Sequence, residues 1–269
     1  MAEEAYGLVV HRFRSLSELP GVVHAVSTRQ GGSSEGPFAS LNVGLHCGDD
    51  DAAVVENRRR LCRAVGMDLG SVVTCDQVLG NVVAWVTRED RGRGATDTES
   101  HFGDVDALIT DEPGVTLMVL SADCPLIALV DPTRPAVGAV HASRRGTLGR
   151  VAPRAVRAMA RLLRCDPSAM LAAVAPSIGP CCYQVGEEVL VAWRAALPDA
   201  DRFFERRDGG LYLDLSAANA AQLVEAGLAR ERIELAGVCT QCHADRFYSY
   251  RAAGRRTGRF GLLLALREP

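Results

Sequence analysis

The sequence lacks the features of a secreted, membrane-spanning or nucleic-acid-binding protein. Its N-terminus, MAEEAYGLVV, carries acidic residues where a signal peptide carries basic ones. No apolar run approaches the roughly 18 residues that span a bilayer. The net charge of −3 gives no general attraction to nucleic acid or to anionic membranes. We therefore expect a cytoplasmic protein that binds neither nucleic acid nor membrane.

The chain also lacks a linker and a disulfide framework. Its 269 residues, 48% of them hydrophobic, can bury a large core. Composition does not change along the chain, so we expect one domain over residues 1–269. Nine cysteines are an odd number, and they are spread over a mid-sized chain. They favour free thiols or metal ligands over disulfides.

The most informative stretch of the sequence runs from Val115 to Gly146. It predicts three consecutive strands over 115–121, 126–131 and 136–141, too apolar to alternate and hence covered on both faces. Cys124 lies in the turn before the second strand, and His141 ends the third. If those two strands pair through the turn at 131–135, Cys124 and His141 are neighbours.

Strands alternate with helices along the rest of the chain, which indicates an α/β fold with a largely buried mixed sheet. Helices are predicted over 49–66, 143–163, 187–196 and 215–228. Strands are predicted over 7–13, 22–28, 105–110, 171–177, 233–238 and 259–266, with two short ones inside 72–86. In the first helix, Arg58, Arg59 and Arg60 are expected to face solvent.

Cys124 and His141 support two functional interpretations and one structural interpretation. They could form a thiolate nucleophile with its imidazole base, or two ligands of a zinc ion. Alternatively, they could be a buried cysteine and a histidine bound to a backbone carbonyl. Asp123 favours a functional role, because a carboxylate in an Asp-Cys-Pro turn can orient a histidine or act as a base.

Two arginine-containing segments are candidate anion sites. Arg29, followed by Gly31 and Gly32, resembles a loop whose backbone amides bind an anion. Near the C-terminus, arginines are interleaved with aromatic residues, a composition that fits either RNA or a phosphate with a stacked purine. The negative net charge favours the small ligand. These residues are Arg246, Phe247, Tyr248, Tyr250, Arg251, Arg255, Arg256 and Arg259.

Cys239 and Cys242, followed by His243, match the attachment pattern of c-type haem. The absence of an export signal argues against haem. A zinc knuckle needs a second cysteine pair, and the adjacent Cys181 and Cys182 have the wrong spacing for one. We therefore expect thiols packed beside a pocket.

An ordered set of motifs over residues 8–267 closely resembles the YfiH-like family. This family is also called the laccase-domain or multicopper polyphenol oxidase family, and its bacterial members include a peptidoglycan editing factor. The matching motifs are STRxGG at 27–32, LNVG at 41–44, GDD at 48–50, ENRR at 56–59, QV at 77–78, DALIT at 106–110, SADCP at 121–125, VHA at 140–142, RG at 145–146, PSIGPCCY at 176–183, and the late CT, FYSYR and TGR.

The resemblance implies a YfiH-like α/β fold of layered mixed β-sheets flanked by helices, distantly similar to the catalytic domain of cytotoxic necrotizing factors. It also implies a zinc-dependent purine nucleoside phosphorylase that acts on adenosine, inosine, guanosine or methylthioadenosine and can deaminate adenosine. Carried over from the motifs, Cys124 and His141 are metal ligands and, with Asp123, catalytic residues. Arg29, Asn42, Arg145 and Arg251 are the expected substrate-binding residues for nucleoside and phosphate, in a monomer or homodimer.

The family's third metal ligand is a histidine, and this chain has Leu79 at that position. Leucine cannot bind zinc, and two protein ligands hold it weakly. Three explanations follow: another residue completes the site, the protein works without metal, or it binds substrate without turnover. Candidates for the replacement ligand are His46, Cys75, His101 and Cys181.

Two rival functions remain. Cys124, His141 and Asp123 could form a cysteine hydrolase or amidase for cell-wall precursor peptides, and Leu79 favours a non-catalytic binding protein. Multicopper oxidation is disfavoured, because the six histidines form no clustered motif.

Overall fold

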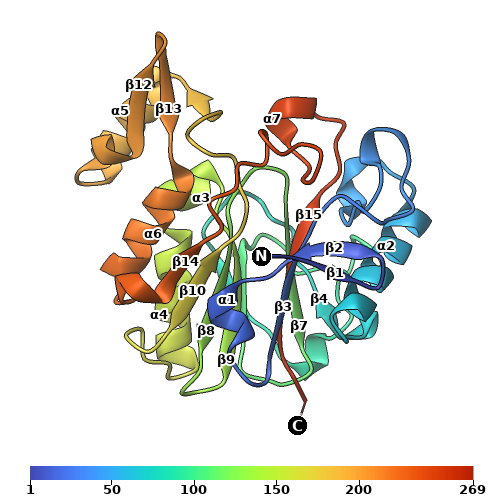
Figure 1. Cartoon of the computed structure of the whole chain (residues 1–269). Helices are drawn as coiled ribbons and strands as arrows, with labels where there is room; N and C mark the ends of the chain where they lie inside the picture. The colour runs from blue at the N-terminus through green and yellow to red at the C-terminus, as the bar shows by residue number, and fades with distance from the viewer. Residues whose placement is uncertain (269) are drawn as a thin grey trace.

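The computed structural model describes residues 1–268, and two six-stranded sheets form its centre. Figure 1 shows them side by side between two groups of helices. The order of the first sheet is β1 (Ala2–Ala5), β2 (Leu8–His11), β3 (Val22–Ser27), β15 (Phe260–Leu266), β7 (Thr116–Ser121) and β4 (Val72–Val73). The order of the second is β14 (Ile233–Leu235), β10 (Leu171–Val174), β8 (Leu126–Asp131), β9 (Ala136–His141), β6 (Ala107–Thr110) and β5 (Val83–Trp85).

Both sheets are mixed. Parallel pairs lie at β4–β7, β5–β6 and β10–β14, and the other named pairs are antiparallel. Every residue of β7, β8 and β9 is buried, as the apolar runs predict. However, β7 belongs to the first sheet, whereas β8 and β9 belong to the second. The loop between β7 and β8 therefore crosses from one sheet to the other, and Cys124 lies in that loop.

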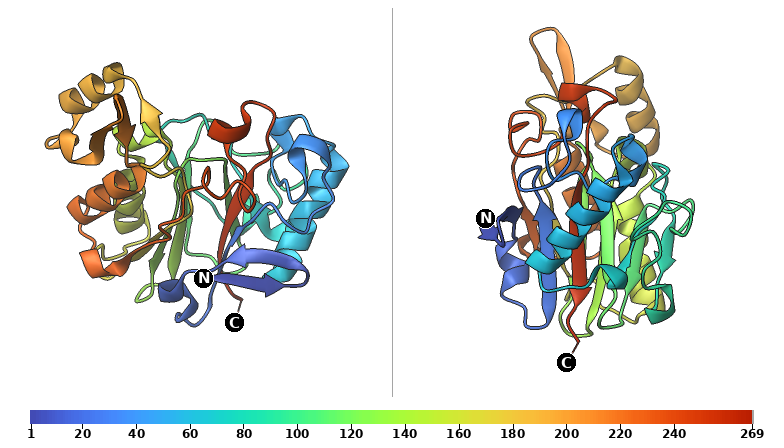
Figure 2. Two further views of the ribbon diagram at one scale, coloured as in Figure 1. Left: turned by 45° about the horizontal axis from the view of Figure 1, so that its top comes forward. Right: turned by 90° about the vertical axis from the view of Figure 1, so that its right-hand side faces the viewer.

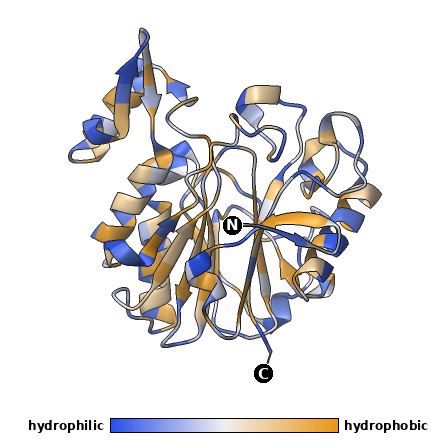
Figure 3. Cartoon of the chain, viewed as in Figure 1, coloured by the Kyte–Doolittle hydropathy of each residue, from blue (hydrophilic) through white to orange (hydrophobic). Residues whose placement is uncertain are grey.

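The sheets pack face to face and bury one large hydrophobic core between them. Leu117, Val119 and Leu262 enter it from the first sheet, and Leu126 and Ala128 enter it from the second. Hydrophobic residues, orange in Figure 3, follow much of the central strands. Burial of such side chains at about 25 cal/mol per Å² is the main term that stabilises a sandwich of this kind.

Helices cover the two outer faces. Helices α4 (Val151–Leu162) and α6 (Leu215–Glu225) pack on the second sheet. Helix α2 (Asp51–Ala64) packs on the first sheet, and the Asp50 side chain caps it by accepting from the amide of Ala52. The turned views in Figure 2 show the same separation of the helices by the sheets. The predicted α/β class with layered mixed sheets is confirmed.

A third, smaller sheet lies beside this sandwich. Its strands are ordered β11 (Gln184–Val185), β13 (Gly210–Leu213) and β12 (Phe204–Arg207), and helix α5 (Glu187–Ala196) contributes Val189 and Trp193 to their common core. The remaining α-helices are short: α1 (Arg14–Ser17), α3 (Arg144–Leu148) and α7 (Tyr250–Ala253). Among residues 1–268, no helix has both the length and the apolar character needed to cross a membrane.

Two local predictions were wrong. The helix predicted over 143–163 is two helices, because Arg150 adopts a left-handed conformation with φ of 61° between α3 and α4. Arg58 does not face solvent: it is 2% exposed and donates to the carbonyl oxygens of Val43, Gly94 and Ala95. These three carbonyl oxygens accept hydrogen bonds from the buried guanidinium, so Arg58 connects α2 to two loops.

Candidate active site

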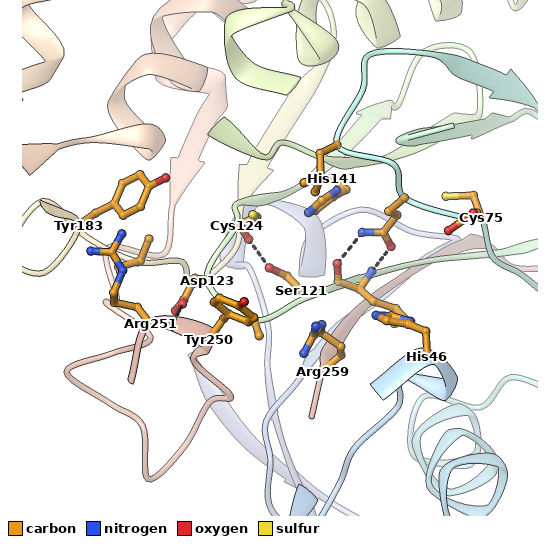
Figure 4. A pocket seen from close by; sticks show the side chains of 16 residues that line it. His46, Cys75, Ser121, Asp123, Cys124, His141, Tyr183, Tyr250, Arg251 and Arg259 are labelled. Carbon is orange, nitrogen blue, oxygen red and sulfur yellow. Dashed lines mark hydrogen bonds between the residues drawn. The ribbon is translucent and has the colours of Figure 1, made fainter. Parts of the chain in front are cut away.

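A cavity of about 650 Å³ opens where the two sheets meet. The β7–β8 loop, the end of β9 and the start of α7 all contribute to its lining. In Figure 4, Tyr183 and Arg251 lie on one side of Cys124, and Cys75 and His46 lie on the other. The cavity therefore joins residues from both sheets around the predicted pair Cys124 and His141.

The β8–β9 register brings Cys124 to His141. Leu126 is paired with His141 across the two strands, and Cys124 lies two residues before Leu126. Cys124 and His141 both line the cavity, and the Cys124 carbonyl accepts from the Ser121 hydroxyl at 2.7 Å. The buried hairpin thus places a thiol and an imidazole together in one cavity.

Asp106, at the start of β6, fixes the imidazole. Its Oδ1 lies 2.8 Å from His141 Nδ1, and its backbone carbonyl accepts from the His141 amide at 2.8 Å. Because a carboxylate only accepts hydrogen bonds, Nδ1 carries the proton and Nε2 is left for Cys124. Sequence reasoning missed this residue and assigned the orienting role to Asp123. The DALIT motif at 106–110 was the available signal.

The loop around Leu79 holds Asp106 in place. The amides of Leu79 and Gly80 donate to the two Asp106 oxygens, at 3.2 and 2.6 Å. Leu79 takes a left-handed conformation with φ of 62°, and its side chain lines the cavity while 40% exposed. The family's ligand position is thus at the cavity, but its side chain offers no metal-binding atom.

The charge state of His141 follows from these contacts. Burial alone would lower its pKa, but the hydrogen bonds to Asp106 and Cys124 outweigh that effect and raise the pKa to about 9. His141 is therefore protonated at neutral pH. Across the cavity, burial, assisted by the guanidiniums of Arg259 and Arg58, lowers the pKa of His46 to about 4, so His46 is neutral there.

Asp123 has a different task from the predicted one. Its carboxylate accepts from the Thr240 hydroxyl at 2.6 Å and from the Arg251 amide at 2.7 Å, and its carbonyl accepts from the Ile178 amide. Its backbone is left-handed, with φ of 108°. Asp123 therefore joins the β7–β8 loop to two other loops of the cavity wall.

Of the four predicted substrate-binding residues, the structure places one in the cavity lining and three outside it. Arg251 lines the cavity. Arg29 does not line the cavity. Its guanidinium donates hydrogen bonds to the backbone carbonyls of Ala39 and Ala244. Asn42 is fully buried and accepts from the Arg259 amide at 2.8 Å, and Arg145 is exposed outside the cavity lining.

Two arginines and two tyrosines give the cavity its charge and its flat surfaces. The Arg251 guanidinium lies 5.1 Å from the centre of the Tyr183 ring and donates to the Gln184 carbonyl. Arg259, which sequence reasoning placed only in a general basic cluster, also lines the cavity, as does Tyr250. Such a set suits an anion beside a planar, apolar group.

The cavity does not complete a three-ligand zinc site. Of the candidate replacement ligands, His46 and Cys75 line the cavity, His101 lies in an adjoining one, and Cys181 is in neither. Within residues 1–268, the only group of three or more cysteine, histidine or acidic ligands whose atoms lie within 4.8 Å of one another lies elsewhere. Cys124 and His141 are thus two ligands without a third, which does not fit a tetrahedral catalytic zinc.

Fold and cavity together define a class: an α/β protein in which two sheets meet at a Cys-His-Asp pocket lined by arginine and tyrosine. The chain belongs to the family described as multi-copper polyphenol oxidoreductase laccase, whose model matches residues 23–267. This confirms the YfiH-like resemblance seen in the sequence.

Similar proteins agree with this membership. The chain is 41% identical over 250 residues to purine nucleoside phosphorylase YlmD of Geobacillus stearothermophilus, covering 92% of this chain and 91% of that one. A crystal structure of YlmD from the same organism superposes with a TM-score of 0.93 at 40% identity, covering 99% and 98% of the two chains. Adenosine deaminase RL5, from an unknown prokaryotic organism, is 33% identical over 240 residues, covering 88% and 91%.

Proposed function

We propose that the protein is a purine nucleoside phosphorylase that uses the Cys124–His141 cavity. In this reaction an oxygen of orthophosphate attacks C1′ of the ribose, the C1′–N9 bond breaks, and its electron pair leaves with the purine. The products are a free purine and ribose 1-phosphate. The observation that carries the proposal is that a histidine held by a carboxylate lines one cavity with two arginines and two tyrosines. The names of the relatives point to the same reaction.

In the proposed mechanism Arg251 and Arg259 bind the phosphate. Both are permanently charged, and a guanidinium binds phosphate oxygens through paired N–H donors. The Arg251 amide is tied to Asp123, and Asn42 accepts from the Arg259 amide. These contacts fix the two backbones from which the guanidiniums extend, so that the phosphate is held in line with C1′.

His141 acts as the general acid. The departing purine gains negative charge as the glycosidic bond breaks, and a proton donor in the transition state lowers that barrier. With a pKa of about 9, the imidazolium holds its proton at neutral pH, and Asp106 keeps the ring in one orientation. Tyr183 and Tyr250 provide aromatic surfaces against which the purine stacks.

Deamination of adenosine is a weaker candidate for this chain. It requires an activated water at C6 of the purine, which a metal site supplies by lowering the pKa of bound water. With Leu79 at the third position the cavity does not complete such a site, and an imidazolium cannot accept a proton. We therefore expect phosphorolysis to dominate, without a metal-dependent step.

The test is to incubate the protein with adenosine and orthophosphate and to separate the products by chromatography. Adenine with ribose 1-phosphate is expected, in amounts that do not change when zinc is added. Arg251→Ala should lower kcat/KM for phosphate about 10- to 100-fold, the loss of a hydrogen bond to a charged group. The exposed Arg145→Ala is the matched control and should leave it unchanged. Inosine as the sole product, or no product from any purine nucleoside, would contradict the proposal.

A second function has one specific observation in its favour. Cys124, His141 and Asp106 are connected as a nucleophile, a base and an orienting carboxylate, as in a cysteine hydrolase. Such an enzyme is inactivated by stoichiometric alkylation of Cys124 near neutral pH and releases ammonia or a cleaved amide from cell-wall precursor peptides. Hydrolysis of such peptides, with no conversion of nucleosides, would decide for this function.

We further propose that the protein works in the cytoplasm on small molecules, as a monomer or homodimer. The nine cysteines are all free, which suits a reducing compartment.

A further inference from the structure

Four cysteines from two distant parts of the chain meet outside the catalytic cavity. Cys181 and Cys182 lie in the loop between β10 and β11, and Cys239 and Cys242 lie in the loop after β14. Their Sγ atoms all lie within 4.8 Å of one another. The sequence argument against a knuckle considered spacing along the chain, whereas the structure brings Cys181 and Cys182 to the second pair from a neighbouring loop.

The sheet explains why the two pairs meet. Strands β10 and β14 are parallel neighbours, so their carboxyl ends emerge at the same edge. The pairing continues past the strands: the Ser177 amide donates to the Val238 carbonyl, and the Thr240 amide donates to the Ser177 carbonyl, both at 3.1 Å. The backbone therefore holds the two cysteine pairs together without help from the thiols.

The distances match a tetrahedral metal site. The Sγ of Cys242 lies 3.4 Å from that of Cys182 and 3.6 Å from that of Cys181. Four thiolates around zinc, at Zn–S distances of about 2.3 Å, place their sulfurs about 3.8 Å apart. No pair is joined as a disulfide. Because all four sulfurs lie within 4.8 Å of one another, one ion can contact all of them.

One sulfur of the cluster, that of Cys239, accepts hydrogen bonds from the backbone. The Gly179 amide donates to the Cys239 sulfur at 3.3 Å, and the Cys242 amide hydrogen-bonds the same sulfur. Such donors stabilise the charged form of a thiol. A Cβ on Gly179 would approach the Cys181 sulfur to 3.2 Å, so this glycine leaves room for the cluster. Arg207 donates to the Cys181 carbonyl at 3.0 Å, which brings a cation close to the ligands.

We propose that Cys181, Cys182, Cys239 and Cys242 bind one zinc ion in a closed structural site. Binding replaces the four thiol protons by Zn²⁺, leaves a net charge of −2 that the guanidinium of Arg207 partly offsets, and involves no change of oxidation state. Four protein ligands leave no open position, so the ion takes no part in the chemistry.

The site would set the shape of one wall of the catalytic cavity. Tyr183 follows Cys182 directly, and Thr240 follows Cys239 and donates to Asp123, beside Cys124. The ion would add a second restraint on the separation of these two loops, beside the backbone hydrogen bonds. The protein would therefore contain one zinc ion per chain, although its catalytic cavity offers only the two metal ligands Cys124 and His141.

The test measures metal content, so its outcome does not depend on the proposed reaction. The full chain, purified under reducing conditions, is analysed for metals as the wild type and as three variants. We expect about one zinc per chain in the wild type, in Cys124→Ser and in the control Cys165→Ser, a cysteine buried outside both sites. Cys242→Ser should lose it.

A second measurement covers the case in which Cys242→Ser does not fold. Zinc is removed from the wild type with a chelator, and Co²⁺ is added to the stripped protein. Absorption typical of thiolate-bound tetrahedral cobalt should appear at one equivalent, remain in Cys124→Ser, and disappear on addition of Zn²⁺.

Four outcomes would overturn the proposal. They are loss of zinc in Cys124→Ser with retention in Cys242→Ser, iron in place of zinc, disulfides among the four cysteines in the reduced preparation, and a stripped protein that takes up no cobalt.

Discussion

Replacing Asp106 by asparagine tests how the catalytic imidazole is held. Asp106 is fully buried, and its two oxygens accept three hydrogen bonds, from His141 Nδ1 and from the amides of Leu79 and Gly80. Asparagine has the same shape but only one acceptor oxygen. In either orientation its NH₂ group faces a donor, so at least one buried N–H loses its partner or His141 takes the wrong tautomer.

The size of the effect follows from these contacts. An unsatisfied buried polar group costs about 1–3 kcal/mol, and breaking a buried charged pair costs about 3–5 kcal/mol. Because His141 can release its proton when the carboxylate is gone, we expect a loss of about 3 kcal/mol. This corresponds to a fall in Tm of roughly 6–12 °C. Turnover should fall about 10²- to 10⁴-fold, the range for losing a positioned general acid.

Asp131→Asn is the matched control. Asp131 is also fully buried and ends β8, the strand whose other end leads to Cys124, and its carboxylate accepts from Thr133, Arg134 and the amide of Asp166. This variant should lose similar stability but keep wild-type kcat/KM. Thermal unfolding and adenosine phosphorolysis between pH 6 and 10 measure both properties. The Asp106→Asn profile should show its acid group titrating well below pH 9.

One result would refute the reasoning about His141. If Asp106→Asn kept the wild-type turnover and the wild-type pH profile while Tm fell as in Asp131→Asn, Asp106 would be a purely structural residue. The general acid would then have to be another group.

Four further predictions test separate parts of the structure. The raised pKa of His141 contributes on the order of 3 kcal/mol to the free energy of unfolding. This contribution is complete below about pH 6.5 and is lost as pH rises through 9. The Tm difference between wild type and His141→Gln should therefore narrow over that range, and a constant difference would contradict the prediction. The pKa of His46 is lowered, so its effect on stability has the opposite pH dependence. Its contribution to the free energy of unfolding should be present above about pH 6.5 and be lost as pH falls through 4, which Tm measured in wild type and His46→Gln will show. Leu79→His should add a second zinc per chain and adenosine deamination, and unchanged metal content and products would disprove the role given to Leu79. Arg58→Ala should lower the free energy of unfolding by about 3 kcal/mol or more in denaturant titrations, against about 0.5 kcal/mol or less for the exposed Arg59→Ala.

The sequence predicted the centre of the fold well because the relevant signals are local. Buried strands at 126–131 and 136–141, joined by a short turn, imply a hairpin, and the hairpin register places Cys124 next to His141. The sheet to which β7 belongs was not predictable in this way. A fully apolar run shows that both faces of a strand are covered, but it does not show which strand lies beside it.

The missed residues were missed for two different reasons. Arg58 stands four residues after Val54 and three before Leu61, on the buried stripe of α2, and its charge led to the wrong expectation. Asp106 and the four cysteines depend on contacts between segments far apart in sequence. Asp106 is 35 residues from His141, and Cys181 is 61 residues from Cys242. Spacing along the chain cannot reveal such contacts, although the DALIT motif marked the first of them.

If the resemblance is right that a metal-binding histidine belongs at position 79, Leu79 affects the two proposed reactions unequally. Leu79 changes only a side chain: its backbone amide still donates to Asp106, as does that of Gly80. Asp106 in turn orients the His141 ring, and in the protein without a bound ion its hydrogen bond opposes the effect of burial and raises the pKa of that ring. A reaction that needs a fixed proton donor and two arginines therefore keeps its machinery. A reaction that needs water activated by a three-ligand metal loses it. Phosphorolysis without deamination is the pattern that this cavity predicts.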